Sequence, residues 1–293
     1  YDSPVVWIES YSGSDLSETP TGRYFIDPDD ELRELKQPSV SAFSSYGGMD
    51  DLHIGAKLLS VGENVYTATS DTSRAVLNGT SASAPGMAGA FALVNSYLKN
   101  RNEASGSLQQ TAEGLLLSAA SPVTAGKQNG ETLYVSPRVQ GFGLLQVEKA
   151  LTANAVLQTD SGLQGISLGD NETGEYEFYF TVRNLSDMPI SYRLSYNLQT
   201  DRSDSGVNTL TPMSLTKQSE IAFTSDNISD GILTVEGNSS AEVGVTLKVD
   251  EKVLAGLKNS FINGSYLEGY VFLTPTEDGV VLSLPDRKST RLN

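Results

Sequence analysis

Two different hydrophobic repeats divide the 293-residue chain near residue 156. Between residues 81 and 98, apolar side chains recur every three or four positions, which is the spacing of one face of a helix. Between residues 175 and 183 they alternate with polar residues, which is the spacing of a strand that buries one face. The chain also exceeds the usual size of one hydrophobic core. We therefore expect an α/β part followed by an all-β part.

The first part is predicted to combine three helices with short strands. Its first helix should begin at about Ser81 and end near residue 100, with one face formed by Met87, Phe91, Val94 and Leu98. The other expected elements are helices at 108–120 and 145–153 and strands at 40–48 and 58–67. Both strands are candidates for a parallel sheet.

The second part reads as several short strands separated by turns rich in Asn, Asp, Gly and Ser. The alternation returns twice after residue 183, at 192–198 and 243–249, and a final apolar strand is expected at 270–273. Short strands at this spacing predict an antiparallel sandwich from about 157 to 285. Residues 286–293 (Asp-Arg-Lys-Ser-Thr-Arg-Leu-Asn) have no apolar period, so we expect a non-native scar or an ordinary disordered tail.

Composition excludes several classes of function. The formal charge of −16 and the pI near 4.4 argue against nucleic acid as a partner, because phosphate backbones are bound by clustered Lys and Arg. No apolar run approaches the length of a membrane span. The absence of cysteine excludes disulfides and thiolate metal sites and fits an exported bacterial protein. The first residues do not resemble a signal peptide, so we expect the natural start upstream.

The sharpest chemical signal is residues 78–85, Asn-Gly-Thr-Ser-Ala-Ser-Ala-Pro. The small residues Gly79 and Thr80 lead tightly into a helix whose first turn carries Ser81. A serine there lies at the positive end of the helix dipole, and its own N–H can point at an oxyanion. Pro85 is expected in the first turn, where its missing N–H costs nothing. The alternative is that Ser81 is only an N-cap. The Gly-x-Ser-x-Gly nucleophile elbow of α/β-hydrolases is excluded, because Ser83 stands where the second glycine is required.

This stretch resembles the Gly-Thr-Ser-x-Ser/Ala-x-Pro box around the nucleophile of the subtilisin-like serine proteases. Residues 43–47 (Phe-Ser-Ser-Tyr-Gly) and 60–66 (Ser-Val-Gly-Glu-Asn-Val-Tyr) resemble segments that precede this box in the family. Residues 136–145 (Ser-Pro-Arg-Val-Gln-Gly-Phe-Gly-Leu-Leu) are similar to the stretch that closes the catalytic domain in the lactocepin and C5a peptidase subfamily of peptidase family S8.

The resemblance implies a fold and an activity. It makes Ser81 the nucleophile, with its N–H in the oxyanion hole and with Gly79, Thr80, Ser83 and Pro85 supporting the motif. It makes residues 1–38 the end of a protease-associated insert and 39–156 the C-terminal part of a subtilisin-like parallel-sheet catalytic domain. A fibronectin-III-like sandwich at 157–285 would follow, as a spacer or docking module. The expected substrates are proteins or peptides, and the expected location is secreted or attached to the cell wall.

The partners that activate such a serine are missing. His53, the only histidine, has no His-Gly-Thr context, so we interpret it as surface or structural. No Asp-Thr/Ser-Gly stretch precedes Ser81, and the oxyanion Asn is expected outside the chain. The chain alone is therefore predicted to be inactive and to be part of a longer protease.

The alternative is a pseudoprotease or an adhesion protein, which the family departures at Ala56, Lys57 and Val61 keep open. Ala82, where Met is common, should only leave more space. No cofactor is identified. The acidic run 27–30 is interpreted as a solvated turn, and calcium is left open for the full-length protein.

Overall fold

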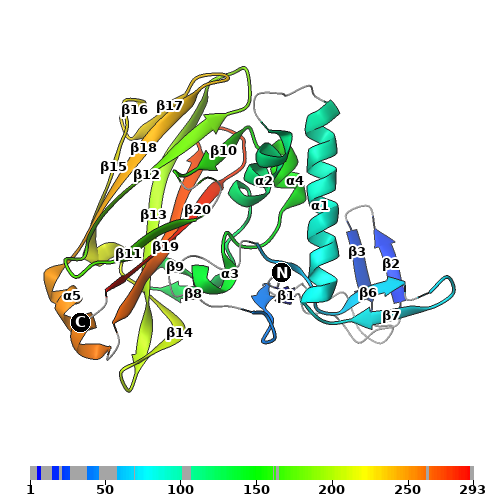
Figure 1. Ribbon diagram of the computed structural model, residues 1–293, viewed down its shortest axis with the longest axis horizontal. Helices are drawn as coiled ribbons and strands as arrows, with labels where there is room; N and C mark the ends of the chain where they lie inside the picture. Colours follow the sequence, from blue (N-terminus) through cyan, green and yellow to red (C-terminus); the bar gives the residue numbers. More distant parts are fainter. Residues whose placement is uncertain are drawn as a thin grey trace.

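The computed structural model describes residues 5–7, 15–19, 22–26, 38–45, 58–68, 70–100, 107–160, 162, 165–261 and 264–290. Four of the sequence features discussed above lie outside these residues, namely His53, Ala56, Lys57 and the acidic run 27–30. The interpretations placed on them therefore stay predictions. The described residues form an α/β part and a β-rich part (Figure 1).

The α/β part contains a small mixed sheet. Strand β1 (Val5–Trp7) pairs in parallel with β5 (Ser60–Val61) and antiparallel with β4 (Ser39–Val40). The expected parallel pairing is therefore confirmed for the strand that begins at Ser60, while the strand that ends at Val40 pairs antiparallel, so the expectation for that strand was wrong. Three hairpins complete the strands of this part: β2–β3 (Asp15–Thr19, Gly22–Ile26), β6–β7 (Val65–Ala68, Arg74–Leu77) and β8–β9 (Thr124–Gln128, Glu131–Tyr134).

Both strands predicted before residue 70 are shorter than expected. The first ends at Val40, because the chain turns at once and the amide of Ser44 donates a hydrogen bond to the carbonyl of Ser41. The second is split into β5 and β6 by a turn that contains Asn64. Asn64 has a φ of 55°, the left-handed conformation that a strand cannot continue through.

The helices lie close to their predicted positions. They are α1 (Thr80–Asn100), α2 (Leu108–Ser118), α3 (Pro137–Gln140) and α4 (Val147–Thr152). Val94 and Leu98 of the predicted face of α1 are buried, and Met87 and Phe91 pack against the same core. The prediction for α1 is confirmed. The short helix α3 was not predicted; the side chain of Ser136 caps it by accepting a hydrogen bond from the amide of Arg138.

The β-rich part consists of two packed sheets. One has the order β10-β12-β18-β15, and the other has the order β11-β20-β19-β13-β17-β16 with β14 attached to β13. The strands are β10 (Ala155–Gln158), β11 (Ile166–Asp170), β12 (Glu175–Asn184), β13 (Ile190–Asp204), β14 (Val207–Ser214), β15 (Ser219–Thr224), β16 (Ile228–Ser229), β17 (Ile232–Val235), β18 (Ser240–Val249), β19 (Ser265–Pro275) and β20 (Leu282–Thr290). The alternation predicted for β12 is confirmed, since Tyr176, Phe178, Phe180 and Val182 are all buried.

Two features of the β-rich part differ from the expectation. Helix α5 (Glu251–Ser260) lies between β18 and β19 and is capped by Asp250, whose carboxylate accepts hydrogen bonds from the amides of Lys252 and Val253. The expected tail is part of strand β20, which pairs with β19 up to Thr290. Its polar side chains gave no apolar signal, yet Asp286 and Lys288 are buried together and form an ion pair.

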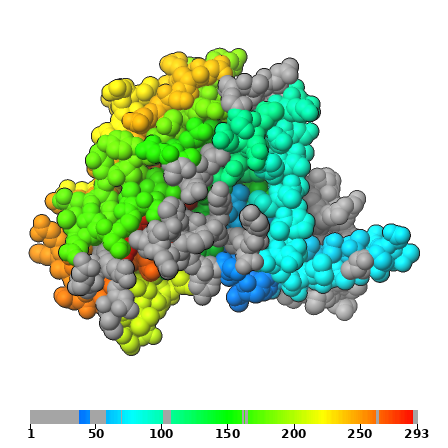
Figure 2. All heavy atoms as spheres, viewed as in Figure 1, coloured from blue at the N-terminus to red at the C-terminus, as the bar shows by residue number. Residues whose placement is uncertain are grey.

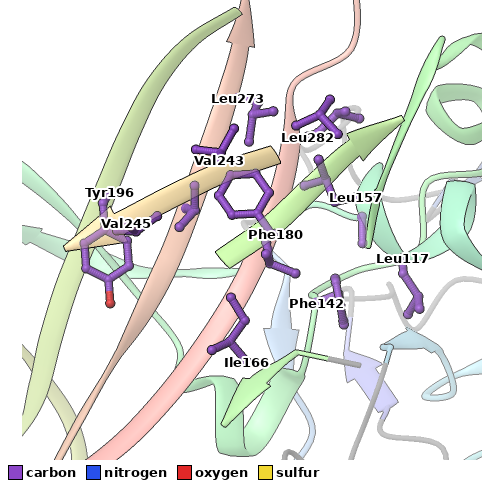
Figure 3. Packing of buried hydrophobic residues seen from close by; sticks show 14 of the residues in the cluster. Leu117, Phe142, Leu157, Ile166, Phe180, Tyr196, Val243, Val245, Leu273 and Leu282 are labelled. Atoms are coloured by element: carbon purple, nitrogen blue, oxygen red, sulfur yellow. The ribbon is translucent and has the colours of Figure 1, made fainter. Parts of the chain in front are cut away.

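One hydrophobic core runs through both parts of the molecule. Figure 3 shows Leu117 of α2 and Phe142 of the α/β part close to Leu157 of β10, beside the sandwich residues Phe180 and Leu282. All five side chains belong to the same cluster of buried residues. The sandwich and the α/β part therefore pack on each other directly.

Candidate active site

Ser81 is the second residue of α1, and its side chain is exposed. The amide of Ala82 donates to the carbonyl of Gly79 at 3.0 Å, so Gly79 is the last residue before the helix. The N–H groups of a first helical turn have no intrahelical acceptor, and that of Ser81 is one of these. Ser81 thus presents a hydroxyl and a backbone donor from the same residue.

Gly79 makes the sharp entry into α1 possible. Its φ of 145° lies in a region that side-chain-bearing residues rarely adopt. Its amide donates to the carbonyl of Gly62 at 2.8 Å, which ties this turn to the end of β5. The neighbouring Asn78 accepts a hydrogen bond on its side-chain oxygen from the amide of Asn64. The turn before Ser81 is therefore fixed at two points.

Ser83 fixes the helix itself. It is fully buried, and its Oγ donates to the carbonyl of Ser60 at 3.0 Å. One turn later, a Cβ added at Gly86 would lie 3.2 Å from the Oγ of Ser60. Helix α1 and strand β5 therefore approach closely just behind Ser81. The role of Ser60 was not visible in the sequence, because a main-chain acceptor leaves no signature in residue type.

Pro85 lies one turn later than the sequence predicted. It is the sixth residue of α1, in the helix interior, and is not in the first turn. A proline there removes the hydrogen bond to the carbonyl four residues earlier, which is the carbonyl of Ser81. The expectation was wrong because it placed the first turn by the motif rather than by the helix start at Thr80. The peptide groups on both sides of Ser81 therefore lack helical hydrogen bonds.

The electrostatic surroundings of Ser81 favour negative charge. Within α1 the first turn carries no acidic residue, and the single charged residue is Lys99 in the last turn. The partial positive charge at the start of the helix is thus not offset by a carboxylate of the same helix. Such a helix start can stabilise an oxyanion that forms on a carbonyl beside Ser81.

No general base for Ser81 is found among the described side chains. Glu63, a carboxylate in the turn after β5, accepts a hydrogen bond from the Oγ of Ser41 at 2.7 Å. Within the described ranges, no three His, Cys, Asp or Glu residues gather where a metal ion could bind. In the described part of the chain, the site is therefore a nucleophile candidate together with a backbone oxyanion donor.

The segment 136–145 lies behind the site and is bonded to it. Its main chain pairs with Leu59, whose amide donates to the carbonyl of Gly143 at 2.8 Å. The amide of Leu145 returns a bond to the carbonyl of Leu59 at 2.9 Å. Gln140 is fully buried, and its side chain bonds to main-chain atoms of Val123 and Val135. This motif therefore supports β5 rather than supplying a reacting group.

Comparison with known proteins places this geometry in context. The family model described as "Fn3-like domain" matches residues 166–285. The C5a peptidase of Streptococcus pyogenes serotype M1 is 28% identical over 275 residues, which cover 92% of this chain and 22% of that protein. The PI-type proteinase of Lactococcus lactis subsp. cremoris is 24% identical over 307 residues, which cover 96% of this chain and 15% of that protein. The chain thus spans less than a quarter of the length of these relatives.

Among solved structures, the prenylagaramide maturation protease PagA matches 38% of this chain and 37% of its own, with 22% identity and a TM-score of 0.30.

Proposed function

The chain is homologous to the subtilisin-like serine proteases of the C5a peptidase and lactococcal proteinase group, and we propose that Ser81 is the nucleophile of a serine endopeptidase. The observation that carries the proposal is the placement of Ser81, with an exposed hydroxyl and a first-turn N–H on the same residue. The catalytic Asp and His are supplied by another part of the full-length protein. In this proposal residues 39–156 are the end of the catalytic domain.

The surface around Ser81 supports a covering element that brings these groups. Helix α1 has no charged residue before Lys99, whereas the outer face of a surface helix usually carries charged and polar residues. Leu93 on its outer face is 53% exposed, and Val76 on the adjacent hairpin is 52% exposed. Figure 2 shows α1 and the β6–β7 hairpin at the surface on one side of the molecule. A polypeptide that covers this face could carry the histidine to Ser81.

The reaction follows from the two groups of Ser81. Its Oγ attacks the carbonyl carbon of a peptide bond while the histidine accepts the hydroxyl proton. The N–H of Ser81 donates to the oxygen that becomes negative. Collapse of this intermediate releases the amine, which takes its proton from the histidine, and leaves an acyl group on Ser81. Water then hydrolyses the ester. An extended peptide would bind as an added strand beside the site.

Location and substrate belong to the same proposal. We place the full-length protein outside the cell, where protein substrates reach it, because this chain resembles proteinases of this group and its own 293 residues include no cysteine. In the part of the chain that the structure describes, no helix has the length and apolar character needed to cross a membrane.

Hydrolysis of an unfolded protein substrate by the full-length protein tests the proposal. Ser81→Ala should abolish hydrolysis. Ser96→Ala is the matched control, because Ser96 is another exposed serine of α1, and it should leave the rate unchanged. A full-length protein in which Ser81→Ala retains the activity would contradict the assignment.

A noncatalytic pseudoprotease is the second candidate. The sequence feature in its favour is that no Asp-Thr/Ser-Gly or His-Gly-Thr stretch precedes Ser81 in this chain. It predicts a folded full-length protein that hydrolyses no peptide bond.

A further inference from the structure

The contact between the two parts of the molecule contains a buried cation. Arg138 of α3 is 7% exposed and lies against two carboxylates of the sandwich, Asp201 of β13 and Glu268 of β19, which are 2% and 1% exposed. Its Nη2 donates to both oxygens of Asp201 at 2.8 and 2.7 Å. Its Nε and Nη2 donate to Glu268 at 3.0 and 3.2 Å. The guanidinium carbon also lies 4.1 Å from the ring centre of Tyr266.

This arrangement fixes the orientation of the Arg138 guanidinium as well as pairing its charge. The planar fork of arginine matches carboxylates with two parallel hydrogen bonds, and a lysine cannot reproduce that geometry. Both carboxylates come from the sandwich, 63 and 130 residues away in the sequence. Burying these charges is costly, so they add little to stability compared with apolar packing of the same volume. What they add is a defined orientation of α3 on the sandwich.

The segment that follows α3 connects it to β5. After α3 the chain bends through Gly143, whose φ is 109°. A Cβ at this glycine would lie 2.5 Å from the carbonyl oxygen of Ser121, so the segment is held tightly on both sides. Here it makes the two main-chain hydrogen bonds with Leu59. The residue that follows Leu59 is Ser60, at the start of β5.

Strand β5 and the residue after it are hydrogen-bonded to residues on both sides of Ser81. The carbonyl of Ser60 accepts the hydrogen bond of Ser83, two residues after Ser81 in the same helix. The carbonyl of Gly62 accepts the hydrogen bond of Gly79, two residues before Ser81. The described contacts therefore run without a gap from the sandwich carboxylates to the turn that carries Ser81.

We propose that the sandwich is a working part of the catalytic unit, in which Arg138 is a positioning residue that holds the Ser81 turn in place through residues 136–145 and β5. Asp201 and Glu268 fix Arg138. This role replaces the spacer or docking role that fold analogy suggested. The proposal rests on the proposed function only for its catalytic consequence. The coupling between Arg138 and the turn that carries Ser81 can be measured in the 293-residue chain itself.

Hydrogen–deuterium exchange on the 293-residue chain tests the coupling. Arg138→Lys keeps the charge and loses the fork, so the amides of Leu59, Leu145 and Gly79 should exchange about tenfold faster. The amides of β12 and β18, in the other sheet, should not change. Arg193→Lys is the matched control, because Arg193 is exposed on the same strand as Asp201. Unchanged exchange at the amides of Leu59, Leu145 and Gly79 would overturn the proposal. An increase in β12 and β18 as large as the increase at these three amides would overturn it too.

A second variant distinguishes loss of the coupling from a folding defect caused by unpaired buried charge. The triple change Arg138→Met, Asp201→Asn and Glu268→Gln removes all three charges together and leaves no carboxylate unpaired. It should fold and still exchange faster at the three reporter amides. Slow, wild-type exchange at these amides in the folded triple variant would contradict the coupling.

Inactivation of the full-length protein by a fluorophosphonate tests the catalytic consequence. Arg138→Lys should lower the maximal inactivation rate about tenfold and leave the half-saturating probe concentration unchanged, because orientation rather than binding is lost. A wild-type protein that does not react contradicts the proposed function, and the exchange experiment still judges the coupling. A wild type that reacts no faster than Arg138→Lys overturns the role of Arg138.

Discussion

The hydroxyl of Ser83 donates a hydrogen bond to the main-chain carbonyl of Ser60, 3.0 Å away, and both residues are buried. This bond joins the helix that carries Ser81 to the strand behind it. Because Ser81 itself is exposed, its position depends on such anchors rather than on its own contacts. The anchors and the sandwich contacts behind them can each be tested.

Ser83→Ala should lower the free energy of unfolding by about 1 to 2 kcal/mol, because a buried hydrogen bond is lost and the carbonyl of Ser60 loses a donor. Urea denaturation of the chain measures the change. Ser96→Ala removes an exposed hydroxyl from the same helix and should change stability by less than about 0.5 kcal/mol. Equal effects of the two substitutions would show that the anchor contributes nothing.

Gly143→Ala should destabilise the chain by more than about 2 kcal/mol. The new Cβ would meet the carbonyl oxygen of Ser121 at 2.5 Å, and a φ of 109° is strained for alanine. Gly89→Ala is the matched control on α1, since nothing lies within 4 Å of its added Cβ. It should stabilise the chain by up to about 1 kcal/mol. Thermal or urea unfolding of both variants distinguishes these opposite signs.

Arg138→Met should destabilise the chain by about 3 to 5 kcal/mol, because Asp201 and Glu268 lose the buried cation that donates hydrogen bonds to both carboxylates. The triple variant that also neutralises both carboxylates should regain most of this loss. Lys248→Met breaks an ion pair with Glu175 whose two side chains are 49% and 57% exposed, and should change stability far less than Arg138→Met does. A triple variant as unstable as Arg138→Met would contradict the argument from unpaired charge.

Asp201 should make stability depend on pH. Burial raises the pKa of Asp201 from 3.8 to about 6, although Arg138 acts in the opposite direction. Between these values the folded protein holds a proton that the unfolded chain has lost, so the stability from this carboxyl is full below about pH 4 and is lost as pH rises through about 6. Relative to Asp201→Asn, the wild-type free energy of unfolding should therefore fall by up to about 3 kcal/mol.

Urea denaturation of wild type and Asp201→Asn at a series of pH values measures this difference. A difference that stays constant, or that grows in favour of the wild type as pH rises, would contradict the raised pKa.

The sequence predicted the elements that repeat regularly. The period of α1 and the alternation of β12 were strong because one face of each is buried over many residues. Helix α5 was not predicted, although Asp250 and the buried pair Leu254 and Leu257 follow the helical pattern, because the alternation of β18 continues up to residue 249. The placement of Ser81 at a helix start was correct, while that of Pro85 was one turn off.

The sandwich contacts of the site could not be predicted. Asp201 and Glu268 are carboxylates within strands, and in a sequence such charged residues are interpreted as exposed positions. Only the fold brings them to Arg138, over separations of 63 and 130 residues. In the same way, Asp286 and Lys288 looked like a charged tail until strand β20 paired them in the core.

The assignment of Ser81 as the nucleophile is tested most directly by reacting the full-length protein with a fluorophosphonate and identifying the modified residue by peptide mass spectrometry. We expect a single adduct on Ser81, formed at neutral pH and absent from Ser81→Ala. A folded full-length protein that forms no adduct, or that carries the adduct on a different serine, would contradict the assignment of Ser81 as the nucleophile.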